Sequence, residues 1–315
     1  MSKKISLFSI LLAILLTNTA LFAQETPLFT IPDTVCAGHE IVPENILDGA
    51  QNYSWTFCPP QLHYPPQGEA FPASDIFINT ANALSVVQAA ESNYTGFAVN
   101  DNGTLTRLGF PLGMTGPAYG YLMGDMDGNM PTAPKGVQAV YDGTTWHVFV
   151  IGGTNLDNTS LMRMDFGNGL MVAPTNVINL GNTDGLLEAP SQLYIAFDGN
   201  NWYGFTFNNG TDLVRLNFGA DLTALPTATF IGNIGGVFQA ASGITAIEED
   251  GNWYLFVTDR FSSGLIKCDM GVSLDNDTPV AVNMGSFNNR LILPTGIAIT
   301  KGCDEYYGYV LNNGG

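Results

Sequence analysis

The sequence predicts an all-β protein, a β-propeller of four-stranded blades, and three observations support this fold class. An aromatic phrase recurs at spacings of 52, 56, 51 and 53 residues, which brings Tyr94, Trp146, Trp202, Trp253 and Tyr306 into register. Each period contains four short apolar segments bounded by Gly, Asn, Asp or Pro, as expected for strands joined by tight turns. No long stretch has apolar residues at helical spacing. Four antiparallel strands about every 50 residues are typical of propeller blades.

The first element, residues 1–23, reads as a signal peptide. A short basic start, "MSKK", precedes one apolar run, and a polar segment follows Ala23. This order predicts export with cleavage near Ala23, and a retained membrane anchor is the alternative. No later segment is apolar for ~18 residues, so we expect no membrane insertion after cleavage. The expected location is extracellular or at the cell surface.

The charge of the mature chain excludes one class of partner. Removal of Lys3 and Lys4 leaves 8 basic residues against 28 acidic residues. A surface of this sign repels nucleic acid and anionic membranes, so we expect neither as a partner.

Residues 24–66 form the second element, which we expect to be a short β segment capping the propeller. Two strand-like pieces, "TVCAGHEIV" and "YSWTFC", surround a polar connection. Cys36 and Cys58 flank this segment and are predicted to be structural, as a disulfide or as buried thiols, since an exported protein meets oxidising conditions. Whether Cys268 and Cys303 pair is left open.

The repeats occupy residues 67–315, with blades near 84–130, 134–187, 190–238 and 241–291 and a partial fifth blade at 294–315. One blade buries little alone, so both apolar faces must pack on neighbours, with Trp146, Trp202 and Trp253 as large fillers between blades. The fifth repeat has only two strands, which predicts further domains of the same polypeptide beyond residue 315. Alternatively, "SDIFIN" (Ser74 to Asn79) pairs with the last blade and closes a small ring.

A basic residue recurs on the third strand of four repeats, at Arg107, Arg163, Arg215 and Lys267. One interpretation is a ring of cations that binds an anion. The other is structural, with each side chain bonded to a neighbouring carboxylate or carbonyl group. We favour the structural role for these four residues.

Candidate binding residues come from the loops. Length variation is confined to the loops between second and third strands, above all Ile151 to Ser160, and variable loops on a regular scaffold often carry binding sites. The candidate binding residues on this face are Asn155, Asp157, Asn158, Asp125 and Asp127. The last two lie in "GDMDGN", which resembles the start of a calcium loop but lacks its final Glu. We therefore expect no cofactor, with calcium as the alternative.

The sequence contains no recognisable catalytic motif. None of the three histidines (His39, His63 and His147) recurs in the repeat or has a nucleophile at a known spacing, and we expect His147 to be packed or solvated. Scattered carboxylates could still pair in space for glycoside chemistry.

Two phrases resemble a known group of proteins. "TVCAG" followed by "YSWTF" resembles the opening of PKD-like, immunoglobulin-type modules in exported proteins of the Bacteroidota, and "SLMRMDFGNGL" from Ser160 resembles their downstream repeats. "GITAIEEDGNWYLFVTD" is also similar to NHL-type propeller units. The resemblance implies type IX secretion, with a sorting or gliding-motility-associated domain beyond residue 315.

The function predicted from these observations is non-catalytic. We expect an exported propeller module of a larger adhesin-like protein that binds glycan or protein or acts as a scaffold. The alternative is a propeller-fold carbohydrate-active enzyme, a lyase or hydrolase. Carboxylates and a histidine around the central channel would favour the enzyme, whereas small and amide side chains there would favour binding.

Overall fold

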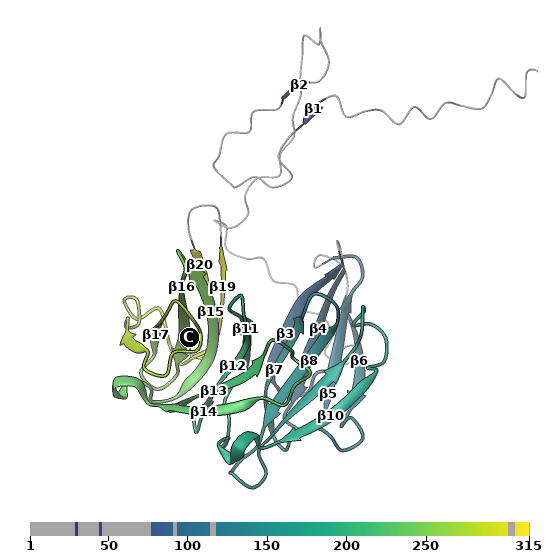
Figure 1. The fold of residues 1–315 in the computed structure, drawn as a ribbon, viewed down its shortest axis with the longest axis horizontal. Helices are drawn as coiled ribbons and strands as arrows, with labels where there is room; N and C mark the ends of the chain where they lie inside the picture. The colour runs from purple at the N-terminus through teal and green to yellow at the C-terminus, as the bar shows by residue number, and fades with distance from the viewer. Residues whose placement is uncertain are drawn as a thin grey trace, which may run out of the picture. The chain divides into compact units, whose positions relative to one another are not determined.

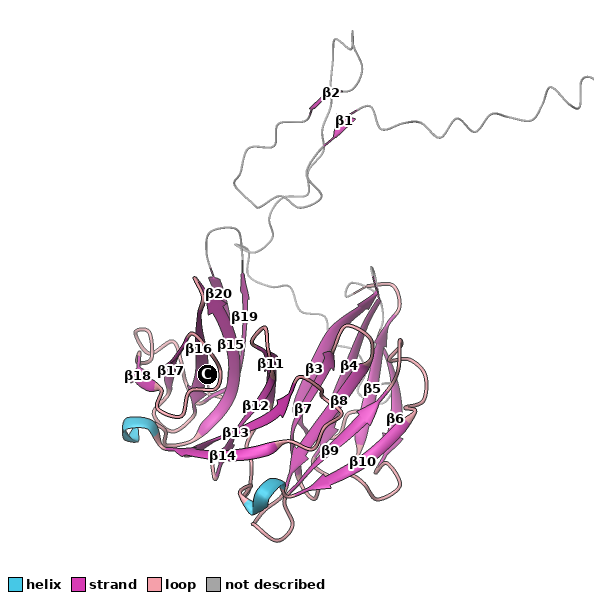
Figure 2. Cartoon of the chain, viewed as in Figure 1, coloured by secondary structure: helices cyan, strands magenta, loops and turns pink. Residues whose placement is uncertain are grey.

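Short apolar segments alternating with tight turns form antiparallel strands throughout the repeats (Figures 1 and 2). The computed structural model describes residues 77–90, 93–113, 118–301 and 306–314, together with the backbone of residues 29–30 and 44–45. The chain divides into two units, and the repeats belong to the one formed by Gly68–Thr300 and Tyr306–Gly315. The expected all-β propeller is confirmed.

Four sheets of four strands and one of two strands make up the described part of the repeat unit, and each sheet follows chain order. The first sheet contains β3 (Ala81–Ala90), β4 (Asn93–Asn100), β5 (Leu105–Phe110) and β6 (Tyr119–Gly124). The second contains β7 (Pro134–Tyr141), β8 (Trp146–Gly152), β9 (Ser160–Asp165) and β10 (Asn176–Gly181). The third contains β11 (Tyr194–Phe197), β12 (Trp202–Asn208), β13 (Asp212–Gly219) and β14 (Thr227–Gly232).

The fourth sheet contains β15 (Ala241–Glu249), β16 (Asn252–Asp259), β17 (Gly264–Gly271) and β18 (Val280–Asn283). The fifth contains β19 (Pro294–Lys301) and β20 (Tyr306–Asn312). Two single turns of 3₁₀ helix follow β10 and β14, at Thr183–Gly185 and Ile234–Gly236. The described residues include no helix long and apolar enough to cross a membrane.

The apolar core lies between neighbouring sheets, as the two-sided apolar strands predict. One cluster joins the first and second sheets and includes Phe97, Val148 and Met162. Two similar clusters fill the next two junctions. Each fully buried aliphatic or aromatic side chain contributes about 1.5–3 kcal/mol, so the stacking of sheets rather than any single blade stabilises the fold.

The first strands of successive sheets approach one another closely because the repeat carries glycine there. A Cβ atom at Gly136 would lie 2.6 Å from the backbone nitrogen of Leu193 in the next repeat. A Cβ atom at Gly243 would lie 2.8 Å from the Cα of Gly296. Any larger residue would therefore force neighbouring blades apart.

Two expectations about the ends of the repeat region have different outcomes. Phe77 and Asn79 lie against the first sheet, because the Thr106 hydroxyl donates to the Phe77 carbonyl (2.7 Å) and the Asn79 amide donates to Asn100 Oδ1 (2.9 Å). The ring-closing alternative for "SDIFIN" is thus wrong for these residues. In the predicted cap, β1 (Phe29–Thr30) pairs with β2 (Glu44–Asn45). Cys36 and Cys58 lie outside the described residues, as does Cys303.

Candidate functional site

The loop candidates Asn155, Asp157 and Asn158 bond chiefly to their own loop between β8 and β9. Asn158 Oδ1 accepts from the backbone amides of Thr154 and Asn155, and Asn155 Oδ1 accepts from those of Asp157 and Asn158. These bonds are the Asx-turn chemistry that shapes a tight loop. A binding role for these three residues remains a prediction.

Asp125 and Asp127 lie in the turn that follows β6. Asn179 connects this turn to the loop of Asn155, since its Nδ2 donates to Asn129 O (3.2 Å) and to Ser160 Oγ (3.4 Å). Both sets of candidates therefore lie at one end of the second sheet. Within the described residues, no group of three or more His, Cys, Asp or Glu side chains is placed to hold a metal ion.

The three repeated tryptophans occupy equivalent positions at the start of the second strand of their sheets. The Trp146 ring contacts that of Tyr141 in a tilted arrangement at a centroid distance of 5.1 Å, and Trp202 contacts Phe197 in the same way at 5.0 Å. In both cases the partner is the residue directly opposite on the first strand. The fourth sheet departs from this pattern, because the residue opposite Trp253 is Glu248. No aromatic ring therefore covers Trp253 from the first strand.

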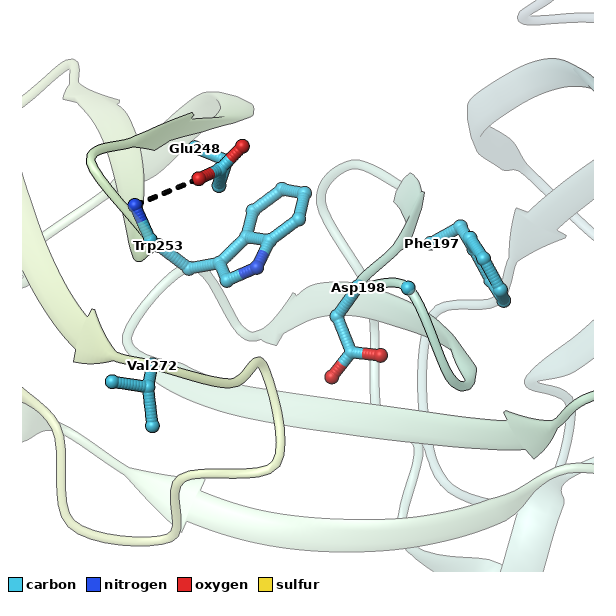
Figure 3. Close-up of a pocket in the computed structure, with 7 residues that line it drawn as sticks. Phe197, Asp198, Glu248, Trp253 and Val272 are labelled. Atoms are coloured by element: carbon cyan, nitrogen blue, oxygen red, sulfur yellow. Dashed lines mark hydrogen bonds between the residues drawn. The ribbon is translucent and has the colours of Figure 1, made fainter.

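A pocket of about 460 Å³ opens beside Trp253, at the turns that join the first and second strands of the third and fourth sheets. Figure 3 shows the indole ring between Glu248 and Asp198, with Phe197 on the far side of Asp198. Val272 and two turn glycines complete the lining. Neither Trp253 nor Glu248 was among the loop candidates, although the break in the aromatic pairing is visible in the sequence.

The two carboxylates of this pocket differ in what they already bind. Asp198 accepts hydrogen bonds from the amides of Asn200 and Asn201 and from the Ser273 hydroxyl (2.8 Å). Burial opposes its ionisation, but these bonds outweigh burial and lower the pKa of Asp198. Glu248 is exposed and uses Oε1 to accept from the Gly251 amide (2.8 Å). The pocket thus offers an aromatic face beside two carboxyl groups.

The strand-three arginines reach into the neighbouring sheet. Arg107 Nη1 donates to the carbonyls of Leu170 and Val172, and Arg163 Nη1 donates to those of Leu222 and Thr223. Arg215 Nη1 donates to the Leu274 carbonyl at 3.5 Å. Lys267 instead lies over the Tyr254 ring, 3.9 Å from its centroid. Each of the three arginines therefore holds the loop that follows the third strand of the next sheet.

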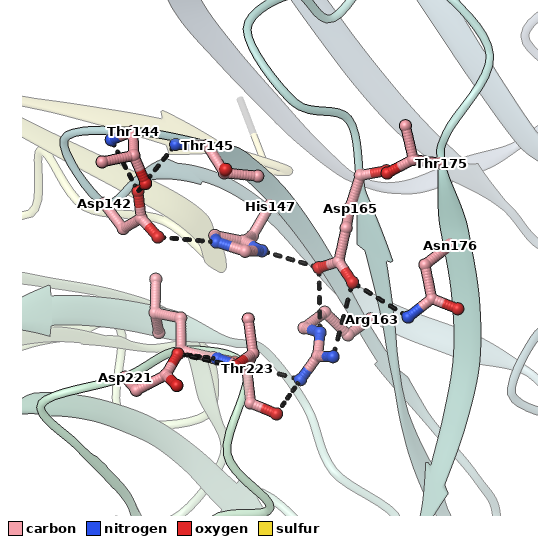
Figure 4. Close-up of polar contacts among 11 residues, drawn as sticks. Asp142, Thr144, Thr145, His147, Arg163, Asp165, Thr175, Asn176, Asp221 and Thr223 are labelled. Carbon is pink, nitrogen blue, oxygen red and sulfur yellow. Dashed lines mark hydrogen bonds and ion pairs between the residues drawn. The ribbon is translucent and has the colours of Figure 1, made fainter.

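His147 is fully buried between two carboxylates, an arrangement the sequence did not predict (Figure 4). Its Nδ1 lies 2.7 Å from Asp165 Oδ1, and its Nε2 lies 3.0 Å from Asp142 Oδ2. Asp165 also accepts from Arg163 Nε (2.9 Å) and Asn176 Nδ2 (3.0 Å). No nucleophile takes part in these contacts. They join two strands and a turn of the second sheet, and Arg163 connects this network to the third sheet.

The thiol of Cys268 is buried in the core between the third and fourth sheets. Burial raises its pKa to about 12. A thiol of this kind is protonated at neutral pH and is a poor nucleophile. Cys268 is a free thiol, and its buried side chain contributes to the packing of this core.

Comparisons with known proteins show similarity in fold only. No family model matches the chain, and no significantly similar curated protein is found. An α-L-arabinofuranosidase from Lactobacillus brevis aligns with a TM-score of 0.51 and 11% identity, over 74% of this chain and 83% of that one. A thermostable family-43 glycoside hydrolase aligns at 0.46 and 11% identity, over 76% and 86% of the two chains. The SapL1 lectin, solved with α-methyl fucoside, aligns at 0.46 and 10% identity, over 73% and 71%. At this level of identity, the similarity to the arabinofuranosidase shows a shared fold and nothing about function.

Proposed function

We propose that the chain is an exported, non-catalytic β-propeller module that binds a glycan in the pocket beside Trp253. The observation that carries this proposal is the replacement of an aromatic partner by Glu248 opposite Trp253. In the second and third sheets the equivalent indole contacts a neighbouring ring on the first strand, whereas here the indole borders a pocket beside carboxyl groups. Sugars present C–H groups on one face and hydroxyl groups at the rim. An indole face and carboxylate acceptors complement both features.

The electrostatics of the described residues support binding rather than hydrolysis. Glycoside hydrolysis uses two carboxyl groups, one of them an acid whose pKa is raised. On the described first strands, which are the inner strands of the blades, the only carboxylates are Glu248 and Glu249. Every aspartate with a shifted pKa is shifted downward, Asp198 included. The other side chains of these strands are chiefly small, aliphatic or amide-bearing, and a surface of this composition supports the proposal of binding.

The cellular setting is part of the proposal and is supported by the sequence. The apolar run before Ala23 favours export, and the resemblance to Bacteroidota surface proteins favours attachment within a larger adhesin-like protein secreted by the type IX system. Cleavage near Ala23 is tested by sequencing the N-terminus of the mature protein recovered from the cell surface or medium. An intact N-terminus would contradict it.

The binding proposal is tested with a glycan array followed by calorimetry on the purified chain. We expect Trp253→Ala to weaken binding roughly tenfold or more, because it removes the stacking face. Trp146→Ala is the matched control, because it removes the same side chain from the equivalent position in the second sheet and should leave affinity unchanged. Absence of any glycan ligand, or equal loss in both variants, would contradict the proposal. Release of reducing sugar from a bound glycan would show that the module is an enzyme.

A further inference from the structure

Of the three arginines that bridge neighbouring sheets, only Arg107 has no carboxylate partner among the described residues. Arg163 holds Asp165 along one edge of its guanidinium group, with Nε at 2.9 Å and Nη2 at 3.4 Å from the two carboxylate oxygens. Arg215 Nη2 lies 2.9 Å from Asp275 and 2.7 Å from Asp277. Within the part of the chain that the structure describes, Arg107 donates through Nη1 alone, to two backbone carbonyls.

The sequence explains why this carboxylate is missing. Asp165 lies two residues after Arg163, and the residue two positions after Arg107 is Gly109. The loop that Arg107 contacts in the second sheet runs through Met171 and Val172, whereas the corresponding loop of the fourth sheet supplies two aspartates to Arg215. Both internal sources of negative charge are therefore absent at the junction of the first and second sheets.

Arg107 is nevertheless buried, with 8% of its surface exposed. Its Nε is enclosed and, like that of Arg215, has no hydrogen-bond partner among the described residues. Burial lowers the pKa of Arg107, and the electrostatic interaction with Tyr121 opposes this shift. A buried cation without a counter-charge is costly, so such groups are normally paired.

A cavity of about 210 Å³ lies beside this guanidinium group. Its remaining walls are apolar or aromatic and come from Tyr121, Met123, Met126, Ala173 and Pro174. The Tyr121 ring lies 5.1 Å from the guanidinium carbon and is 59% exposed, so little packing holds it in place. At ~30 Å³ per molecule, the space exceeds that of a few waters.

We propose that this cavity binds a small organic carboxylate, such as a uronic acid, whose carboxylate group pairs with the Nε–Nη2 edge of Arg107. The ligand would occupy on Arg107 the position that Asp165 occupies on Arg163. Planar guanidinium groups bind carboxylates through this edge by two parallel hydrogen bonds. Binding requires the exposed Tyr121 ring, which lies over the guanidinium group, to move aside, and the thioether and proline walls contact the apolar part of the ligand. This site is independent of the pocket beside Trp253.

Calorimetry on the full chain at constant ionic strength tests the proposal with four probes: D-glucuronate, acetate, D-glucose and sulfate. We expect the two carboxylates to bind and glucose not to bind. Arg107→Gln should weaken carboxylate binding roughly tenfold or more, as expected for loss of charge-assisted hydrogen bonds. Lys135→Gln is the matched control, since it removes one positive charge from an exposed side chain of the second sheet and should change nothing. Equal binding of sulfate, or equal loss in the control, would overturn the assignment.

A second variant keeps the test decisive if Arg107→Gln folds poorly. Gly109→Asp supplies the internal carboxylate that Arg163 already has, and Met171→Ala makes room, because a Cβ at Gly109 would lie 2.8 Å from Met171 Cε. We expect this double variant to fold, to melt at a higher temperature than Met171→Ala alone, and to lose carboxylate binding. Carboxylate binding at unchanged affinity would show that the ligand does not use Arg107.

Discussion

The junction between the first and second sheets and the junction between the second and third use the same arginine in two different electrostatic settings. Arg107 and Arg163 each donate to two carbonyls of the neighbouring loop. Only Arg163 also has a carboxylate, Asp165, which in turn contacts His147. The contacts with carbonyl groups recur at both junctions because the backbone geometry of the blades repeats. The carboxylate partners depend on side chains that differ from one junction to the next.

This difference separates a structural junction from one that can accept a ligand. At the second and third sheets, every charge of the network has a partner inside the protein, and Asp142 completes it through His147. At the first and second sheets, the same cation borders a cavity with apolar and aromatic walls. A repeated side chain that lacks its usual partner therefore marks a candidate binding position. Arg107 lacks a carboxylate in this way, and Trp253 lacks an aromatic ring on the first strand.

The largest expected effect concerns the fully paired junction. Asp165→Ala removes the counter-charge of Arg163 and a hydrogen-bond partner of His147, both of which are buried. We expect a loss of about 3–5 kcal/mol in the free energy of unfolding, measured by urea denaturation. Asp165→Asn retains a hydrogen-bond acceptor and should lose less. A loss under about 1 kcal/mol in Asp165→Ala would show that the network is not stabilising.

The second prediction compares the two arginines directly. Arg163→Met leaves Asp165 without its cation and should destabilise the protein by about 3 kcal/mol. Arg107→Met replaces a buried, unpaired cation by an apolar chain, and the gain from removing the charge offsets the loss of two carbonyl contacts. We expect it to cost under about 1 kcal/mol. Equal losses in urea denaturation would refute the distinction between the junctions.

The fold could be predicted from the sequence because its signals are local and repeated. Turn glycines, short apolar segments and one tryptophan or tyrosine per period recur at nearly constant spacing. Each four-stranded sheet of the structure covers about one such period, and the first of them begins with β3 at Ala81. Such patterns can be recognised in the sequence without knowledge of any long-range contact.

The candidate site could not be predicted in the same way because it depends on which side chains meet. Loop length pointed to Asn155 and its neighbours, but the pocket beside Trp253 depends on the register that places Glu248 opposite the indole. His147 was expected to be packed or solvated, yet Asp142 and Asp165 converge on it from 5 residues before and 18 residues after. The Arg107 cavity depends on the absence of a carboxylate at Gly109, the position equivalent to Asp165 in the next repeat.

The third prediction uses the pH dependence of the same junction. Burial disfavours ionised Asp165, but hydrogen bonds from Asn176 and His147 and the charge of Arg163 outweigh burial and lower its pKa. The pKa of Asp142 is also lowered, because the hydrogen bonds to its carboxylate outweigh the effect of burial. The folded state therefore binds fewer protons than the unfolded state, so this stability is present at neutral pH. It is lost as the pH falls below about 4.

The urea concentration at the midpoint of unfolding should accordingly decrease as the pH is lowered from 5 to 3. Asp165→Asn should reduce this slope without abolishing it, since Asp198 and Asp259 also have lowered pKa values. Arg107→Gln is the comparison from the other junction and should leave the slope unchanged. An identical slope in Asp165→Asn and the parent protein would place the acid sensitivity elsewhere.

The smallest expected effect on stability comes from restoring the aromatic pair in the fourth sheet. Glu248→Phe gives Trp253 the cross-strand partner that Trp202 has in Phe197. It adds a ring contact of about 0.5–1 kcal/mol but loses the hydrogen bond from the Gly251 amide to Glu248, so the net change in unfolding free energy should stay below about 1 kcal/mol. Glycan binding should nevertheless fall sharply, because the new ring covers the indole face and removes an acceptor. The variant thus separates stability from recognition, and a Glu248→Phe protein that binds glycan normally would show that the open face of Trp253 is not the binding surface.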